Sequence, residues 1–366
     1  MKLPAMMRVN QLTLQQFRNV SQMGLDFPHN LTVFIGDNGQ GKTNIIESLV
    51  FLSSGRSFRV NDDRYLIQDK KQFAKIDAIL DSKHRLGVVI SEQGKFLQVN
   101  QNVIKKLSDF IGYCNVVLFN PDDLNFFTDA PRKRRRDVDF ELGKISKDYL
   151  AILSRYTRVL SERNAYLKSK ALDTDYLEVI TDELVSVQIP IIKQRNAFRK
   201  RIEPRINHYY QMITQQDVHV TLDYRCSVSP EDEDIKTSLH TKMKESLRRD
   251  QELRMTQVGI HRDDFVFKVE GIPVVNVSSQ GQKRMLMIAY KLALVDLIFE
   301  SQGYYPILCL DDLFSELDET RRKLVIEILP AAMQVFITTT DLRFIMTERE
   351  LNVFDVRGGH VHKEGN

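Results

Sequence analysis

The sequence contains no tryptophan and only three cysteines, and its charges nearly cancel: 52 Lys and Arg face 49 Asp and Glu, a net charge of +3. Cys114, Cys226 and Cys309 are odd in number and far apart, which argues against a disulfide framework or a cysteine metal site and indicates a reducing compartment. The small net charge means that binding to a polyanion would depend on local basic clusters.

Long apolar segments are also missing. The N-terminus lacks the apolar run of a secretory signal, and no window approaches the roughly 20 residues of a membrane span. We therefore expect a cytoplasmic protein that does not contact a membrane. A chain of 366 residues can bury a substantial core and form two or three compact regions.

Hydrophobic periodicity divides the chain into three regions. Short β-rich runs dominate up to about Phe119, apolar residues then recur every three or four positions between about Pro131 and Leu253, and strands return near Thr256. This pattern predicts one α/β domain in two halves with a helical insertion. The expected boundaries are 1–125 for the N-terminal half, 126–255 for the insertion and 256–366 for the C-terminal half.

The segment "GDNGQGKT" matches the glycine-rich phosphate loop at every defined position, and it lies between an apolar strand and a helix. In such loops backbone N–H groups bind the phosphates, the lysine reaches the β and γ oxygens, and the last hydroxyl binds Mg²⁺. The alternative to a phosphate loop is a structural glycine turn that carries Lys and Thr by chance. The predicted nucleotide-binding residues are Gly36, Asp37, Asn38, Gly39, Gln40, Gly41, Lys42 and Thr43.

A second motif, "ILCLDDLFSELD", supports the first. Its four apolar residues Ile307 to Leu310 predict a buried parallel strand, whose carboxyl end would deliver two carboxylates beside the phosphate loop. We expect Asp311 to hold Mg²⁺ and Asp312 to orient or deprotonate the attacking water. An acidic strand end at the surface is the alternative for this motif alone.

The segment "SSQGQKR" places polar, flexible residues before the apolar run "MLMIAYKLALVDLIF", where a helix N-terminus would favour an anion. Ser279, Gln280, Gly281 and Gln282 resemble the signature motif of ABC-type ATPases. That resemblance implies two heads that enclose two ATP molecules, with Ser279 of each head facing the γ-phosphate held by the other. Ser279 would then act in catalysis with Lys42, Asp311 and Asp312.

Seven phrases, in the same order over nearly the whole chain, resemble the RecF family of recombination and repair ATPases in the SMC-like group: "LQQFRN", "GDNGQGKTNIIESLVFL", "GRSFR", "FNPDDL", "RYTRVLSERNAYLK", "GIHRDDF" and "SSQGQKR". The resemblance implies a P-loop ABC-type ATPase head with an N-terminal β-rich subdomain and an inserted helical domain. It also implies nucleotide contacts by Arg18 and Asn19. ATP and Mg²⁺ are the expected cofactors.

As partners, the family resemblance implies a second copy of the chain, bound in an ATP-dependent homodimer, and double-stranded or gapped DNA, bound without sequence preference. It further implies help in loading RecA together with RecO and RecR, and a link to replication and the SOS response. Two departures suggest slow hydrolysis: Asp312 stands where most relatives have Glu, and Thr340 and Asp341 stand where many have a switch histidine. No glutamine-loop residue is assigned.

Three basic segments are candidates for DNA contact, because their cations can neutralise phosphates. A solvated helix face explains each segment equally well. The network "GIHRDDF", from His261 to Asp264, is either structural or part of a nucleotide-sensing interface. A transport or signalling head that docks a protein partner remains the alternative function. The candidate DNA-binding residues are Arg56, Arg59, Arg132, Lys133, Arg134, Arg199, Lys200 and Arg201.

Overall fold

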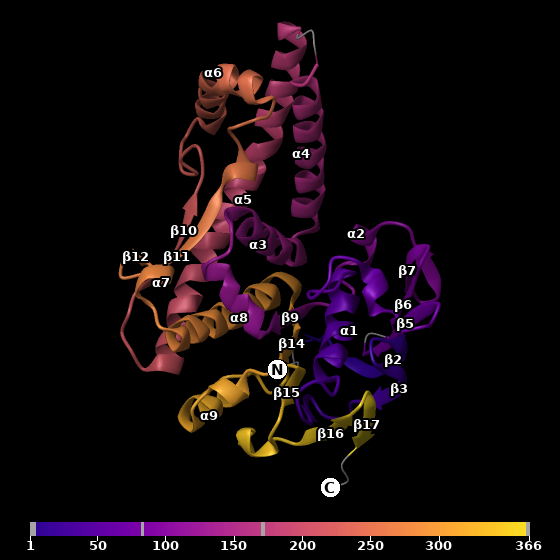
Figure 1. The fold of residues 1–366 in the computed structure, drawn as a ribbon. Coiled ribbons are helices and arrows are strands. Elements are labelled where there is room, and N and C mark those ends of the chain that lie inside the picture. Colours follow the sequence, from indigo (N-terminus) through magenta and orange to yellow (C-terminus); the bar gives the residue numbers. More distant parts are fainter. Residues whose placement is uncertain (1–4, 82–83, 170–172, 364–366) are drawn as a thin grey trace. The chain divides into compact units, whose positions relative to one another are not determined.

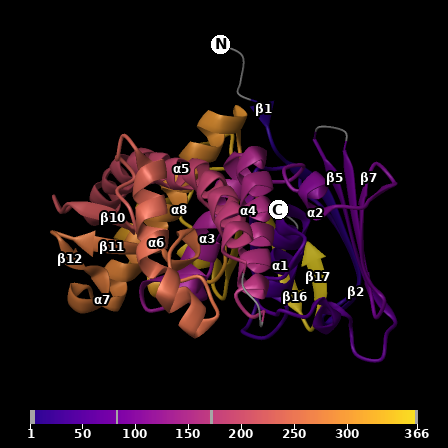
Figure 2. The same cartoon turned by 90° about the horizontal axis from the view of Figure 1, so that it is seen from above.

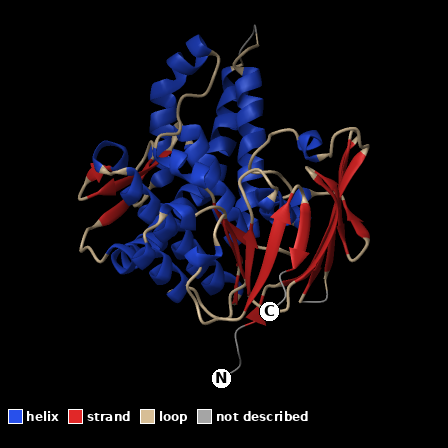
Figure 3. Ribbon diagram, turned by 60° about the horizontal axis from the view of Figure 1, so that its bottom comes forward, coloured by secondary structure: helices blue, strands red, loops and turns tan. Residues whose placement is uncertain are grey.

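The computed structural model describes residues 5–81, 84–169 and 173–363, and the chain divides into two compact units. Strands are concentrated in unit 1, whereas unit 2 is mostly helical (Figure 3). Unit 1 comprises Met1–Asp123, Tyr209–Gln216 and Met287–Asn366, and unit 2 comprises Leu124–His208 and Asp217–Leu286.

Unit 1 contains a six-stranded sheet, within the described residues, that draws strands from both ends of the chain. Its order is β17-β16-β4-β15-β14-β9, and every neighbouring pair except β16 and β17 is parallel. Yellow C-terminal strands therefore lie beside indigo N-terminal segments (Figure 1). The strands are β4 (Leu31–Ile35), β9 (Val116–Phe119), β14 (Ile307–Leu310), β15 (Val335–Thr339), β16 (Leu351–Arg357) and β17 (His360–Lys363).

A second sheet of unit 1 is antiparallel, with the order β3-β2-β5-β6-β7-β8 in the described chain. In Figure 2, β2, β5 and β7 form one curved layer of this unit. Buried and more exposed side chains largely alternate along β2 and β5, because only one face of the sheet meets the core. The strands are β2 (Val9–Phe17), β3 (Val20–Asp26), β5 (Phe73–Leu80), β6 (Arg85–Ser91), β7 (Gly94–Val99) and β8 (Asn102–Ile104).

Helix α1 (Lys42–Ser54) packs between the two sheets, since it contacts β9 and β15 of the first and β6 of the second. Its apolar residues are buried on all sides, and one hydrophobic cluster joins Leu14, Leu49, Val88 and Phe336 from all three layers. This packing places the first turn of α1 at the edge where β4 ends.

Unit 2 is built around α5 (Thr174–Thr214), a 41-residue helix about 60 Å long at 1.5 Å per residue, with Pro190 and Pro204 inside it. Unit 2 also contains a small antiparallel sheet of order β10-β11-β12. The remaining elements of this unit are α3 (Pro131–Ile145), α4 (Lys147–Tyr166), α6 (Ile235–Leu253), α7 (Val274–Val277), β10 (Val220–Arg225), β11 (Asp264–Val269) and β12 (Ile272–Pro273).

A few elements complete the chain. Helix α8 runs through the boundary at Met287 and so belongs to both units, as does α5 at Tyr209. None of the described helices is long and apolar enough to cross a membrane, and the three cysteines are free thiols. These elements are α2 (Leu107–Phe110), α8 (Gln280–Gln302), α9 (Glu319–Glu327), β1 (Ala5–Met6) and β13 (Tyr304–Tyr305).

The predicted fold class, an α/β head with an N-terminal β-rich part and an inserted helical part, is confirmed. The two compact units divide the chain differently from the expected regions, since Tyr209–Gln216 lies in unit 1. The chain stays in unit 2 up to Leu286 rather than leaving the insertion at residue 256, because β11 pairs with β10 along its whole length. The segment "VVNV", which follows the strands that return near Thr256, forms the short helix α7.

Candidate nucleotide-binding site

The loop "GDNGQGKT" connects β4 to α1 and has a backbone that only glycine accommodates at two positions. Gly41 caps α1 with a φ of 112°, and a Cβ at Gly36 would lie 2.4 Å from the carbonyl oxygen of Val356. The first turn of α1 carries no acidic residue. The Asn44 amide donates to the Gly41 carbonyl at 3.0 Å, and the partial positive charge of the helix start favours an anion beside the loop.

Lys42 is buried at the start of α1, and its ammonium group turns back onto the loop. Nζ donates to the carbonyl oxygens of Gly36 at 2.6 Å and Asp37 at 2.9 Å. Burial lowers the pKa of Lys42, and the nearby carboxylates of Asp312, Asp311 and Asp37 oppose that shift. A phosphate group in the loop would offer this cation a stronger partner than the two carbonyls.

The two sequence motifs meet at one hydrogen bond. Thr43 Oγ1 donates to Asp311 Oδ1 at 3.0 Å, although 268 residues separate them. Burial raises the pKa of Asp311, while the hydrogen bonds from the Thr338 and Thr43 hydroxyls oppose the rise. A hydroxyl and a carboxylate are the hard oxygen ligands that Mg²⁺ prefers, so these residues fit the ion.

Asp312 follows at the same edge with an unusual backbone. Its φ is 50°, in the left-handed region, and its buried Oδ1 atom accepts no hydrogen bond from the described residues. A buried carboxylate oxygen without a hydrogen-bond donor is unfavourable in free energy. This oxygen therefore indicates a binding position for water or for a polar ligand. This free oxygen suits the role that the sequence predicts for Asp312.

Asn19 supports the phosphate loop from the β2–β3 turn. Its Nδ2 donates to the carbonyl oxygen of Gln40 at 3.1 Å, and its Oδ1 accepts from Asn44 Nδ2 at 2.7 Å. From the β16–β17 turn, the amides of Gly359 and Gly358 donate to the Gln40 carbonyl at 2.9 Å and to its side chain at 2.7 Å. Asn19 therefore holds the loop backbone, which differs from the direct nucleotide contact suggested by the sequence.

Arg18 is likewise not directed at the loop but forms a bidentate pair with Glu47. Its Nε and Nη2 donate at 2.9 and 2.8 Å to the two oxygens of this fully buried carboxylate, and Nη1 donates to the Tyr65 carbonyl. Glu47 also accepts from Ser57 at 2.5 Å and lies 3.7 Å from Arg59. The sequence motifs assign no role to Glu47, although an acid inside the apolar run "NIIESLVFL" requires a partner.

The signature segment lies in unit 2, whereas the phosphate loop lies in unit 1. Ser279 caps α8: its Oγ accepts from the Gln282 amide at 3.2 Å, and its own amide donates to Gln282 Oε1 at 2.8 Å. This reciprocal pair is a capping box, and all four residues from Ser279 to Gln282 remain exposed. The Ser279 hydroxyl still has its proton to donate.

The structure contradicts one candidate DNA contact. Arg134 is mostly buried and forms a bidentate pair of 2.8 and 2.7 Å with Asp264, so it is a structural residue. Arg199 is three-quarters buried and bonds Asn196. Among the other candidates, Arg132 and Arg201 are exposed, and Arg56 lies half-buried after α1. The remaining three have partners within the chain: Lys133 pairs with Asp129, Lys200 pairs with Glu231, and Arg59 donates a hydrogen bond to Asn44.

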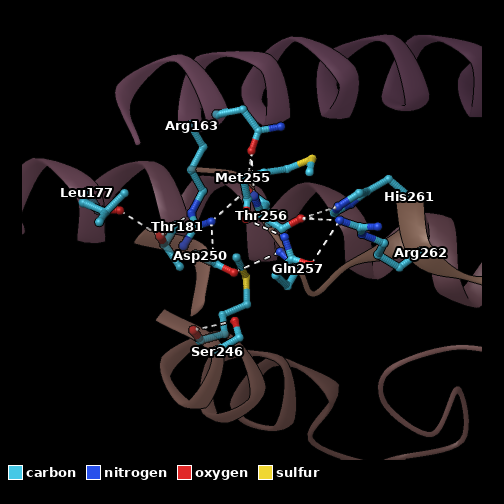
Figure 4. A network of polar contacts seen from close by, with 12 residues as sticks. Arg163, Leu177, Thr181, Ser246, Asp250, Met255, Thr256, Gln257, His261 and Arg262 are labelled. Carbon is cyan, nitrogen blue, oxygen red and sulfur yellow. Dashed lines mark hydrogen bonds and ion pairs between the residues drawn. The ribbon is translucent and has the colours of Figure 1, made fainter. Parts of the chain in front are cut away.

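His261 belongs to a polar network inside unit 2 (Figure 4). Its Nε2 bonds the Thr256 carbonyl at 3.0 Å and its Nδ1 bonds the Tyr156 hydroxyl at 2.7 Å. A carbonyl only accepts, so Nε2 carries the proton and Nδ1 accepts from Tyr156. Burial lowers the pKa of His261, which favours this neutral form.

The rest of "GIHRDDF" is satisfied in the same unit. Arg262 donates to Gln257 at 3.2 Å, and Asp263 accepts from the buried Arg195 at 2.9 Å and from Tyr224 at 2.5 Å. Asp264 holds Arg134, as described above. These contacts support the structural alternative for the segment from His261 to Asp264.

Comparison with known proteins identifies relatives of the whole chain. The sequence model of the RecF/RecN/SMC N terminal domain family matches residues 8–361. A protein of Enterococcus faecalis described as "DNA replication and repair protein RecF" is 37% identical over 98% of this chain and 99% of its own length. The chain belongs to the RecF family. A Streptococcus suis protein with the same description is 37% identical over 97% of this chain and 99% of its own length.

Solved structures extend the RecF family comparison to the fold. A structure described as the recombination mediator protein RecF-ATP in the RecFOR pathway matches with a TM-score of 0.90 and 28% identity, covering 100% of this chain and 99% of that one. An Smc head domain of Pyrococcus furiosus matches with a TM-score of 0.59 and 15% identity over 98% of this chain and 96% of that one. The second similarity shows the shared head fold alone.

Proposed function

We propose that the protein is an ATP-dependent DNA-binding ATPase of recombinational repair and replication, which dimerises on duplex or gapped DNA in the cytoplasm when it binds ATP. The hydrogen bond between Thr43 and Asp311 carries this proposal, because it joins both halves of a nucleotide site in a member of the RecF family. The descriptions of the relatives support RecO and RecR as partners. RecA loading and the SOS link rest on family resemblance.

Each residue of the site has a distinct task. Lys42 would exchange the carbonyls of Gly36 and Asp37 for the β and γ phosphates. Thr43 and Asp311 would hold Mg²⁺, which when bound neutralises phosphate charge. Asp312 would accept a hydrogen bond from the attacking water through the buried oxygen that lacks a donor.

The signature residues would serve the nucleotide of a second copy. Among the residues that the structure describes, none requires glycine at position 281: an added Cβ would meet only Ser279 Oγ, at 3.9 Å. Glycine in a helix also costs about 1 kcal/mol relative to alanine. Open space beside an exposed capping hydroxyl suits a phosphate brought by a partner. The ATP-dependent homodimer is therefore part of the proposal.

For DNA, the start of α3 offers the best-supported contact. Arg132 and Lys133 occupy its first turn, the helix end where cations are unfavourable for stability, and no side chain caps it. Lys133 pairs with Asp129 at 2.7 Å within the chain, whereas the placement of the exposed Arg132 is better explained by binding to an external anion. Lys200 and Arg201 on α5 are exposed and remain proposed contacts, as do Arg56 and Arg59.

The alternative, a head coupled to a protein partner in transport or signalling, is not favoured. The RecF relatives match this chain over 97–98% of its length, including the helical insertion that distinguishes the two functions.

The proposed function is tested with Asp312→Asn and Lys42→Ala. We expect Asp312→Asn to bind ATP normally but to hydrolyse it about 10²- to 10⁴-fold more slowly, because the group that orients water is lost. Lys42→Ala should weaken ATP binding on the order of 100-fold, because charge-assisted hydrogen bonds to the phosphates are lost. For each protein, the hydrolysis rate and the ATP affinity are measured with and without duplex DNA. The affinity for the DNA is measured with and without ATP, over a series of salt concentrations.

Lys71→Ala is the matched control, because Lys71 is an exposed lysine in a turn of the same unit. It should behave as the wild type. Normal ATP affinity in Lys42→Ala would contradict the assigned site, and DNA binding that ignores both ATP and salt would contradict the proposed function.

A further inference from the structure

Thr338 is a buried residue near the end of β15, and it touches both carboxylate residues of the site. Its Oγ1 donates to Asp311 Oδ1 at 2.7 Å and accepts from the backbone amide of Asp312 at 2.9 Å. The side chain is 1% exposed. One hydroxyl therefore fixes the carboxylate of one residue and the backbone of the next.

Strand register explains why this residue reaches the site. β15 lies between β4, which leads into the phosphate loop, and β14, which leads into Asp311. Ile337 is paired with Leu310, so the next residues, Thr338 and Asp311, adjoin where the strands end. Side chains alternate between faces, and the hydroxyl of the following Thr339 instead donates to the carbonyl of Asp341.

The two contacts of Thr338 matter more once the site is loaded. Asp311 Oδ1 accepts from Thr43 as well as from Thr338, but the Thr43 hydroxyl is also the proposed Mg²⁺ ligand. If the Thr43 hydroxyl binds the ion instead of Asp311, the hydrogen bond from Thr338 Oγ1 still orients the Asp311 carboxylate. The left-handed backbone of Asp312 is also an unfavourable conformation, which persists only where surrounding contacts hold it.

We propose that Thr338 is a positioning residue of the ATP site: its hydroxyl orients the Asp311 carboxylate towards Mg²⁺ and holds Asp312 in the conformation that serves the attacking water. This inference rests on the proposed function. A hydrogen bond to a metal-ligating carboxylate fixes its orientation, and loss of such a contact lowers metal affinity or activity by about 10- to 100-fold.

The test compares Thr338→Val, which replaces the hydroxyl by a methyl group, with Thr338→Ser, which restores a hydroxyl. Thr339→Val is the control, because it removes the neighbouring hydroxyl that does not contact Asp311 or Asp312. For each variant we would measure the Mg²⁺ concentration that half-saturates binding of a fluorescent ATP analogue, the affinity for the analogue in EDTA, the hydrolysis rate and the thermal unfolding midpoint.

Thr338→Val should raise the half-saturating Mg²⁺ concentration about 10- to 100-fold, while its nucleotide affinity in EDTA stays within about twofold of the wild type. Thr338→Ser should recover most of the loss, and Thr339→Val should match the wild type. Thr338→Ala replaces the valine variant if the latter does not fold.

An unchanged Mg²⁺ requirement in a folded Thr338→Val protein would overturn the inference, as would an equal loss in EDTA or a failure of serine to restore binding. A wild-type protein that binds the analogue without any response to Mg²⁺ would instead contradict the proposed function. The two failures are therefore distinguishable.

Discussion

The pair of Arg18 and Glu47 offers a direct test between a nucleotide contact and a structural role. The sequence suggests that Arg18 contacts the nucleotide, but the structure directs its guanidinium to a fully buried carboxylate on α1. We expect Arg18→Met and Glu47→Gln to destabilise unit 1 and to leave ATP affinity within about threefold of the wild type, a change below 1 kcal/mol.

The magnitude follows from burial. Removing one partner of a buried ion pair costs about 3–5 kcal/mol, because the remaining charge loses its counter-charge. Without Arg18, Glu47 would keep only the longer contact with Arg59 at 3.7 Å. The Arg18 side chain keeps 17% of its exposure, whereas Glu47 has none. We therefore expect the lower end, about 3 kcal/mol, for each single variant. The double variant removes both charges and should lose about 3–4 kcal/mol rather than the sum of about 6 kcal/mol, a coupling of about 2–3 kcal/mol.

The assay is urea unfolding followed by circular dichroism, which suits a chain without tryptophan. ATP affinity is measured on the same preparations. Additive losses of stability would refute the ion-pair argument. Wild-type stability combined with a large loss of ATP affinity in Arg18→Met would show that the arginine binds the nucleotide directly.

Two further predictions concern unit 2. Ser279→Arg should leave ATP binding by the monomer intact but abolish ATP-dependent dimerisation and hydrolysis together, as measured by light scattering and phosphate release; a dimer that forms normally would show that this serine only caps α8. Asp250→Asn should destabilise unit 2 by about 3–5 kcal/mol in urea, because it leaves Arg163, fully buried and 2.7 Å from the carboxylate, without a counter-charge. Combining it with Arg163→Met should recover part of that loss, and a cost below about 1 kcal/mol for the single variant would contradict the assignment.

Features that depend on neighbours in the chain could be predicted from the sequence. The phosphate loop is one example, because eight consecutive residues and their own backbone geometry form it between a strand and a helix. The capped start of α8 is another, since Ser279 and Gln282 satisfy each other within one turn. The helical character of the insertion followed from periodicity alone.

Only the tertiary structure decided which side chains meet across long stretches of chain. Arg18 pairs with Glu47 rather than contacting the loop, Arg134 pairs with Asp264 across 130 residues, and Thr338 reaches both acids of the site. Such contacts depend on strand order, register and packing, and a shift of one residue in a strand would turn its side chains to the opposite face. Periodicity identifies a strand, but it contains no information on which strand lies beside it, and this neighbour decides the partner of each polar group.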